Sequence, residues 1–254
     1  MPLADFSKYE SMIREYRMNP EIGLVGDSLY SLKRQDFIDR AKFLEDEGLR
    51  CTLHAPFHDM MPGAQDEYVL KATREKLRRC FDLIEIFRPE SVVCHLGYVE
   101  SVHSYDLAQW LDNSLETWKS LLSMAEELST PVVFENTYEP GPRIHKMLLE
   151  ALNSPSARFC LDVGHLLAFA RVPWPQWLSN LEQWLAQLHL HDNLGFRDEH
   201  LPVGKGVFDF AGLFSHLKAR KITPIITLEP RNENDLLDSL NALDRLGLFD
   251  HKSG

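Results

Sequence analysis

The feature that most constrains the fold of this 254-residue chain is a regular alternation of short apolar segments with longer amphipathic ones. Seven short segments are rich in β-branched and other apolar residues and are bounded by polar residues, which is typical of buried β-strands. An eighth and weaker strand is expected at residues 2–6. The seven segments span residues 21–26, 50–57, 91–98, 131–137, 158–165, 185–193 and 224–230.

The segments between these strands carry apolar residues at helical spacing, and we expect helices at residues 31–48, 67–87, 106–128 and 174–185. Strands that are apolar on both faces and alternate with helices indicate a parallel sheet with helical crossovers. Seven or eight such units suit a closed barrel better than an open sheet. We therefore predict an α/β fold, a single (β/α)8 TIM barrel. Because no Gly/Ser-rich linker interrupts the chain, we expect one domain over residues 1–254.

The composition, with 44% hydrophobic and 26% charged residues, is that of an ordinary globular protein. A formal net charge of −11 indicates an acidic surface and argues against a nucleic-acid partner, which would require clustered Lys and Arg. The first residues lack the pattern of a signal peptide, and no apolar run reaches the ~18 residues of a membrane span. We expect a cytoplasmic protein without a membrane segment, and make no prediction of its oligomeric state.

The four cysteines show no CxxC spacing, and three of them lie inside apolar strand-like runs. This placement is typical of buried thiols in a reducing compartment. We therefore expect neither disulfides nor a zinc site with cysteine ligands. The cysteines are Cys51, Cys80, Cys94 and Cys160.

Histidines and carboxylates recur where the predicted strands end, about once in each strand–helix unit. In a barrel these ends meet at one mouth, where the active sites of such folds are built. A buried carboxylate or histidine costs on the order of several kcal/mol unless it is paired or bound to a metal. Packing alone therefore does not explain the whole set. Its members are His54, His95, Glu135, Asp162, His165, His189 and Glu229.

A loop adds two further candidates, Asp198 and His200, which form a D-x-H pair followed by Gly204 and Gly206. In an extended segment, residues two apart point to the same side, so both side chains could hold one ion. The glycines would permit a tight turn beneath them. Taken alone, the pair is equally consistent with a solvated loop; beside the strand-end residues it indicates a metal site.

Histidine and carboxylate ligands suit divalent ions, and the large share of histidine favours Zn²⁺ over Mn²⁺. Because no cysteine takes part, a closed structural zinc site is not expected. An open site with a bound water, as in metalloenzymes, is expected instead.

The segments "HAPF", "CHLG", "FEN", "LDVGH", "HLHD", "DEHLPVGKG" and "LEP" give the chain a resemblance to the xylose isomerase-like TIM-barrel superfamily over about residues 20–230. That superfamily contains sugar and sugar-phosphate isomerases and epimerases, together with endonuclease IV. The resemblance implies one divalent metal held by the core ligands. These would be Glu135, Asp162, His189 and Glu229.

Endonuclease IV is similar in a fuller way, because its three-zinc cluster uses nine ligands and all nine positions carry a matching residue type here. The resemblance implies a first ion at His54, His95 and Glu135, a second at the four core ligands, and a third at His165, Asp198 and His200. One to three ions are therefore expected. His191 is not a ligand in the family pattern, so we expect it to support the ligands, as would Asn136 and Asp192.

Two functions remain open. In a sugar or sugar-phosphate isomerase or epimerase, the ion would polarise a carbonyl while Glu135 and Glu229 move a proton at the neighbouring carbon. The substrate would be a small carbohydrate, and Arg197 or Lys205 could hold a phosphate. In an endonuclease IV-like phosphodiesterase, a metal-bound hydroxide would attack phosphorus. Net charge −11 and the absence of basic, aromatic DNA loops favour the isomerase class.

Overall fold

The computed structural model describes residues 1–247, and the chain divides into two compact units. The amino-terminal unit comprises Met1–Glu135 with Met147–Arg158, and the carboxy-terminal unit comprises Asn136–Lys146 with Phe159–Gly254. Strand order follows chain order, from β1 to β7, and the ladders are parallel. This is the arrangement that helical crossovers impose. A single domain over residues 1–254 stays a prediction.

Four short strands form the sheet of the amino-terminal unit: β1 (Glu21–Gly23), β2 (Thr52–His54), β3 (Val92–His95) and β4 (Val132–Glu135). Strands β3 and β4 are apolar on both faces except where they end, which explains their near-complete burial. The helices of this unit are α1 (Phe6–Tyr16), α2 (Ser28–Ser31), α3 (Arg34–Asp46), α4 (Glu67–Phe81), α5 (Ile84–Phe87), α6 (Glu100–His103) and α7 (Leu107–Glu127), with 3₁₀ turns at Leu3–Asp5 and Ser104–Asp106.

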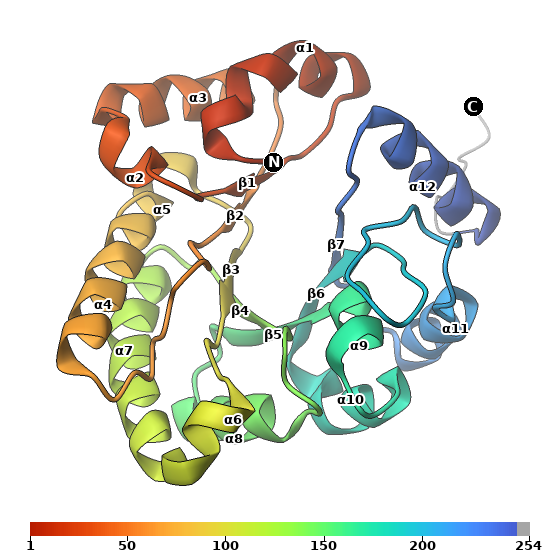
Figure 1. The fold of residues 1–254 in the computed structure, drawn as a ribbon. Coiled ribbons are helices and arrows are strands. Elements are labelled where there is room, and N and C mark those ends of the chain that lie inside the picture. The colour runs from red at the N-terminus through yellow and green to blue at the C-terminus, as the bar shows by residue number, and fades with distance from the viewer. Residues whose placement is uncertain (248–254) are drawn as a thin grey trace. The chain divides into compact units, whose positions relative to one another are not determined.

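Two long helices of this unit, α4 and α7, lie side by side on one side of β2, β3 and β4 (Figure 1). Trp118 of α7 packs edge-on against Phe134 of β4, with ring centroids 4.9 Å apart. Arg74 of α4 donates to the Thr117 hydroxyl of α7 at 2.7 Å. Helix α7 thus packs on the sheet through Trp118 and is tied to α4 through Arg74.

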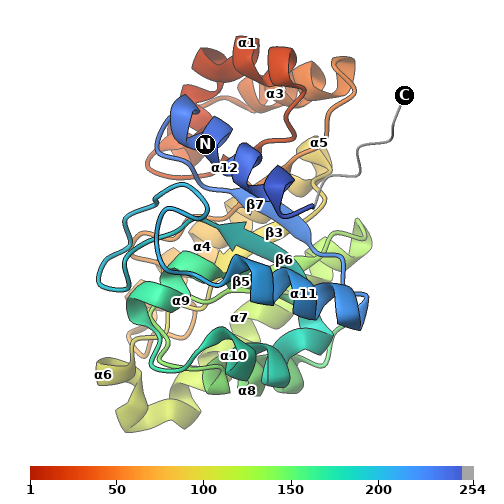
Figure 2. The ribbon, with the colours of Figure 1, turned by 90° about the vertical axis from the view of Figure 1, so that its right-hand side faces the viewer.

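The carboxy-terminal unit is built around β6 (Leu185–Leu190) and β7 (Ile225–Leu228), which pair with each other, and around the end of β5 (Ala157–Asp162), which pairs with β6. Helices α11 (Phe210–Arg220) and α12 (Glu233–Arg245) lie on one side of β6 and β7 (Figure 2). Both β5 and α8 (Arg143–Leu152) have residues in each unit. The other helices are α9 (Val163–Phe169) and α10 (Trp174–Leu181), with a 3₁₀ turn at Glu182–Trp184.

The seven expected strands all appear, each shorter than its apolar run. The eighth expected strand, at residues 2–6, is wrong: Leu3–Asp5 is a 3₁₀ turn that leads into α1, and only Pro2 forms an isolated bridge, to Gly23. The expected helix at 67–87 is broken into α4 and α5, whereas the one at 31–48 appears as α3. Sequence reasoning did not identify α1, α2, α6, α8, α9, α11 and α12.

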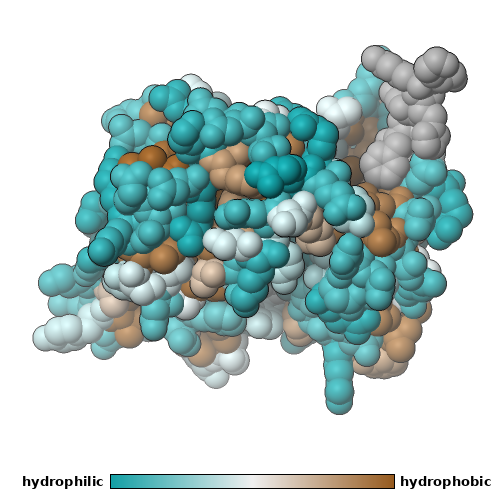
Figure 3. Space-filling view, turned by 90° about the horizontal axis from the view of Figure 1, so that it is seen from above, coloured by the Kyte–Doolittle hydropathy of each residue, from teal (hydrophilic) through white to brown (hydrophobic). Residues whose placement is uncertain are grey.

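The surface over α1 and α3 is mostly hydrophilic, with scattered apolar patches, as the net charge of −11 leads one to expect (Figure 3). Among residues 1–247, none of the helices combines the length and the hydropathy that a bilayer span requires. The four cysteines are all buried thiols outside any disulfide, which confirms the expectation of buried thiols. Burial raises the pKa of Cys51 to about 12, with a smaller contribution from the charge of Glu90.

Candidate metal centre

Strand register places predicted ligands opposite one another within each unit. In the amino-terminal unit His95 of β3 pairs with Glu135 of β4, and both are the last residues of their strands. In the carboxy-terminal unit Asp162 of β5 pairs with His189 of β6. Side chains at paired positions of adjacent strands lie on the same face of a sheet. The geometry of the parallel ladder therefore brings the residues together without any special loop.

The amino-terminal cluster consists of His54, His95 and Glu135. The Nε2 atom of His54 lies 3.1 Å from Oε2 of Glu135, and Nε2 of His95 lies 3.0 Å from the same oxygen. Glu135 is almost completely buried, at 1% exposure. Ligand atoms from all three residues lie within 4.8 Å of one another. Two imidazoles therefore converge on one buried carboxylate oxygen.

The hydrogen bonding of His54 indicates what this cluster can hold. Nδ1 of His54 donates to the carbonyl oxygen of Ala55 at 2.9 Å, because a carbonyl can only accept. In the neutral ring, Nε2 then carries a lone pair that faces the carboxylate of Glu135. Two facing lone pairs repel unless a proton or a metal ion lies between them. The two imidazole nitrogens and the carboxylate oxygen of this cluster therefore fit a divalent ion.

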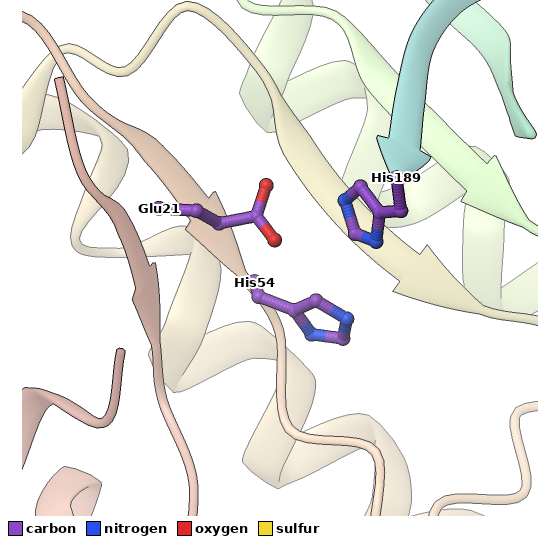
Figure 4. Close-up of side chains that lie close together, drawn as sticks. All are labelled: Glu21, His54 and His189. Carbon is purple, nitrogen blue, oxygen red and sulfur yellow. The ribbon is translucent and has the colours of Figure 1, made fainter. Parts of the chain in front are cut away.

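Neighbouring side chains frame the two imidazoles. Phe57 packs against both, with ring centroids 5.2 Å from His54 and 5.1 Å from His95. Glu21 of β1 points to the same side of the sheet as His54 of β2 (Figure 4). Its Oε2 accepts from the Thr52 hydroxyl at 2.9 Å. Sequence reasoning missed Glu21. The available signal was a carboxylate at the start of a strand, which does not reveal the side to which it points.

The carboxy-terminal cluster consists of Asp162, His165, His189, His191, Asp198, His200 and Glu229. Asp162 is fully buried and caps α9: its Oδ1 accepts from the backbone N–H of His165 at 2.7 Å. Its Oδ2 lies 3.4 Å from Nδ1 of His165 and 3.2 Å from Nε2 of His191. A capping aspartate thus also serves as the point on which two histidines converge.

His189, near the end of β6, belongs to the carboxy-terminal cluster (its side chain is drawn in Figure 4). Its Nδ1 lies 3.0 Å from Oε1 of Glu229, which follows directly after β7. Its Nε2 is 3.2 Å from the side-chain amide of Gln187, which also donates to Thr227 at 3.0 Å. Gln187, which is fully buried, is a further residue that sequence reasoning missed. The sequence does not indicate which side chain a polar residue inside an apolar strand contacts.

The loop pair behaves differently from the prediction. Nε2 of His200 does lie 3.2 Å from Oδ2 of Asp198, and Nε2 of His165 lies 3.4 Å from the same oxygen. The expected extended segment is wrong, however, because His200 has a φ of +49° and is left-handed. Asp198 and His200 meet because the chain turns at this point. Alternation along an extended strand is not the cause.

Two buried polar residues hold this loop and the end of β5. Asp192 accepts from the backbone N–H groups of Gly204, Gly206 and Phe208, at 3.1, 2.8 and 3.2 Å. Asn136 exchanges two hydrogen bonds with the backbone of Asp162. A Cβ at Gly206 would lie only 2.2 Å from the carbonyl oxygen of Asn193, so this close approach requires glycine. Both polar residues were expected to support the ligands, and the contacts are of that kind.

Electrostatics in the carboxy-terminal cluster favour charged partners. Burial opposes ionisation of Asp198, but hydrogen bonds from His165 and His200 and their charges hold its pKa well below the usual value. Burial also opposes protonation of His200. The hydrogen bond to Asp198 and the negative charges of Glu229, Asp198 and Asp162 nevertheless raise its pKa to about 9. A cation, either a proton or a metal ion, is therefore strongly favoured among these carboxylates.

Both cations of the loop, Arg197 and Lys205, are exposed, and their role in holding a phosphate stays a prediction. Nζ of Lys205 lies 3.8 Å from Oδ2 of Asp238. All nine predicted ligands lie in one of the two clusters. Their roles as ligands stay predictions.

Comparison with known families now bears on the fold and on these strand-end residues. The model of the xylose isomerase-like TIM barrel family matches residues 16–246. The chain belongs to this family. The predicted fold class, an α/β TIM barrel, and the predicted superfamily are thereby confirmed.

Individual relatives are distant. An uncharacterized protein of Methanocaldococcus jannaschii, MJ1311, is 28% identical over 202 residues, which cover 77% of this chain and 69% of the relative. The fold is similar to that of a D-tagatose 3-epimerase-like protein, with a TM-score of 0.82, 23% identity and coverage of 94% and 91% of the two chains. It is also similar to the TTHB071 protein of Thermus thermophilus, soaked with ZnCl₂, with a TM-score of 0.80, 24% identity and coverage of 97% and 95%.

Proposed function

We propose that this protein is a divalent-metal-dependent isomerase or epimerase of sugars or sugar phosphates, with a small carbohydrate as substrate. Zn²⁺ is the expected ion, with Mn²⁺ as the alternative, in one to three copies. The observation that carries the proposal is the meeting of three of the four core ligands: Nδ1 of His189 lies 3.0 Å from Oε1 of Glu229 and 3.8 Å from Oδ2 of Asp162. The epimerase-like protein with a similar fold supports the same class.

In this proposal the ion supplies Lewis acidity, which polarises a substrate carbonyl and makes the neighbouring C–H more acidic. The protein must then move a proton at that carbon. Glu135 and Glu229 are the proposed acid and base. The side chain of Glu229 is 22% exposed, so a substrate can reach it, and His189 holds its Oε1 at 3.0 Å. This contact fixes the direction in which the carboxylate can take a proton.

Exchange of a substrate proton with solvent tests the proposal. The protein is incubated in D₂O with Zn²⁺ or Mn²⁺ and a panel of ketoses, aldoses and their phosphates. Deuterium next to the carbonyl is then measured by NMR and mass spectrometry. We expect incorporation into at least one sugar, reduced at least about 100-fold in Glu229→Gln, because a general base contributes that much or more.

Glu139→Gln is the matched control. Glu139 is a buried carboxylate whose Oε2 accepts from the backbone N–H of Thr137 at 2.7 Å, and it is a member of neither cluster. This variant should keep the wild-type exchange rate. If the metal-loaded wild type exchanges no proton with any sugar of the panel, the proposed function is wrong.

A second candidate is an endonuclease IV-like phosphodiesterase. The pairing of His54 and His95 on Glu135 favours it, since the resemblance assigns these three residues to an ion that the single-metal isomerases lack. The net charge of −11 opposes it, because affinity for a phosphate backbone depends on Lys and Arg contacts. Incision of a duplex that contains an abasic site, abolished in Glu135→Ala, would establish this function in place of the isomerase.

A further inference from the structure

His191 lies in the carboxy-terminal cluster, although the family pattern assigns it no role as a ligand. It follows His189 by two residues and is 1% exposed. Its Nε2 lies 3.1 Å from Oδ1 and 3.2 Å from Oδ2 of Asp162. A carboxylate only accepts, so Nε2 carries the proton and Nδ1 of the neutral ring carries the lone pair.

The lone pair of Nδ1 faces a second carboxylate. Oδ1 of Asp198 lies 3.5 Å from Nδ1 of His191. Within residues 1–247, neither of these two buried atoms has a hydrogen-bond partner. A buried polar atom without a partner is costly, and here two acceptors are aimed at each other. This arrangement is stable when a cation occupies the space between them.

The separation fits a shared metal ion. Two ligands of a tetrahedral zinc ion, with Zn–N and Zn–O distances of about 2.0 to 2.2 Å, lie about 3.3 Å apart. The 3.5 Å between His191 and Asp198 is close to this value and too long for a hydrogen bond of ordinary strength. His165 is near as well: its Nε2 lies 3.4 Å from Oδ2 of Asp198, and its ring is inclined by 82° to that of His191.

The ring of His191 is also held rigidly in place. It stacks on His200, with centroids 3.9 Å apart and planes 5° apart. On its edge it meets Gly164, where an added Cβ would lie 1.9 Å from Cε1 of the ring. Within the described part of the carboxy-terminal unit, two groups of three side chains could each hold an ion, and both include His191. They are Asp162, His165 and His191, and His191, Asp198 and His200.

We propose that Nδ1 of His191 is a metal ligand, and that it binds a divalent ion together with Asp198 beside His165. The proposal rests on the metal dependence in the proposed function. Asp162, by accepting the proton of Nε2, fixes the tautomer in which Nδ1 can bind. His191 is thus more than a support for the other ligands.

Cobalt substitution of His191→Cys tests the assignment. A thiolate bound to Co²⁺ gives a near-ultraviolet charge-transfer band, which an imidazole ligand does not give. We expect this band in Co²⁺-loaded His191→Cys and not in the wild type, whose four cysteines are buried and are not among the predicted ligands. His216→Cys is the matched control, because His216 pairs with Glu182 at 2.9 Å and is a member of neither cluster. It should show no band.

Metal affinity gives a second readout. His191→Asn should weaken the affinity for one ion by more than about 100-fold in a chelator competition, beyond the roughly 10- to 100-fold of a supporting residue. If His191→Cys does not fold, the nitrogen chemical shifts of the wild type answer the question: Zn²⁺ should shift Nδ1 of His191 and leave Nε2 protonated.

The failures are distinguishable. If the wild type binds metal but folded His191→Cys gives no band and His191→Asn keeps wild-type affinity, the assignment of His191 is wrong and the proposed function stands. The same holds if Zn²⁺ leaves the Nδ1 shift of the wild type unchanged. If the wild type binds no divalent metal, both proposals are wrong.

Discussion

The amino-terminal cluster and the carboxy-terminal cluster reach similar chemistry by different means. In the first, three strand ends suffice: parallel register alone brings His95 opposite Glu135, and His54 reaches the same oxygen. In the second, strands supply only part of the set. A helix cap at Asp162 and a loop tied to Asp192 supply the rest. The amino-terminal cluster therefore depends on the sheet alone, and the carboxy-terminal cluster depends on the sheet together with its loops.

The largest expected effect is on metal binding in Asp162→Asn. Asparagine is almost isosteric and remains a good N-cap, so α9 should persist, but the charge on which His165 and His191 converge is lost. We expect the affinity of the carboxy-terminal cluster for its ion to fall more than about 100-fold. Elemental analysis after dialysis against a chelator measures this.

His54→Asn is the counterpart in the amino-terminal cluster. If the clusters bind separate ions, the two variants lose different ions and the double variant loses the sum. Equal metal content in both single variants and in the double variant would mean that a common ion is lost, and the distinction between the clusters would then be wrong.

A smaller effect is expected for Gln187→Leu, a buried change on β6. The amide of Gln187 lies 3.2 Å from Nε2 of His189 and fixes the orientation of this ring. Leucine keeps the volume but leaves His189 without this partner. We expect a roughly 10- to 100-fold loss in metal affinity, as is typical when a residue behind a metal-binding histidine is removed.

Competition with a chromophoric chelator measures the loss in Gln187→Leu. Gln187→Glu should restore much of the affinity: when Nδ1 of His189 binds the ion, Nε2 carries the ring proton, and a carboxylate at position 187 can accept it. Unchanged affinity in Gln187→Leu would mean that the strand alone orients His189, as it does the ligands of the amino-terminal cluster.

Because the carboxy-terminal cluster depends on its loop, we expect Gly206→Ala to affect both stability and metal binding. The added Cβ meets the Asn193 carbonyl oxygen at 2.2 Å and Oδ1 of Asp192 at 2.4 Å, so the loop must move. We expect about 1–3 kcal/mol of lost stability and weaker metal binding. Gly141→Ala is the control, because its Cβ would meet Val172 at an ordinary 3.4 Å. Urea denaturation measures the stabilities of both. If Gly206→Ala leaves metal binding intact, the ligands do not depend on this loop.

Particular residues show how far sequence carries the fold and the site. The strands were predictable because their apolar runs are short and bounded by polar residues. Where such runs stop, polar residues stand out: His54, His95, Glu135, Asp162 and Glu229. The parallel ladder fixes the backbone conformation at a strand end. It therefore also fixes contacts between paired residues, such as His95 and Glu135.

Other contacts depend on conformations that no local pattern encodes. Packing of distant segments determines three such features. They are the left-handed backbone of His200, the hydrogen bonds from three backbone N–H groups to Asp192, and the close contact of Gly164 with the ring of His191. The start of the chain was misjudged for a related reason: residues 2–6 are apolar enough for a strand, but Phe6 begins the helix α1, whose polar face dominates the following residues.

The smallest expected effect is a pH dependence in metal-free protein. The pKa of His200 is about 9 in the folded chain and about 6.5 when unfolded. A raised pKa means that the folded state binds the proton more tightly. His200 therefore adds stability that is fully present below about pH 6.5 and is lost as pH rises through 9. Urea denaturation of chelated protein across this range should show the loss. His200→Asn should remove it, whereas His58→Asn, at an exposed position, should not.

A metal ion and a proton compete for His200. This competition tests whether the carboxy-terminal cluster uses a loop residue as a ligand, unlike the amino-terminal cluster. At neutral pH an ion that uses Nε2 of His200 must displace its proton, since Asp198 and the ring nitrogen face each other at 3.2 Å. Calorimetric titration with Zn²⁺, repeated in buffers of different ionisation enthalpy, should therefore detect a released proton that is missing in His200→Asn. Release of the same size in His200→Asn would mean that the ion does not bind at this loop, and that the carboxy-terminal cluster, like the amino-terminal one, takes its ligands from strand ends.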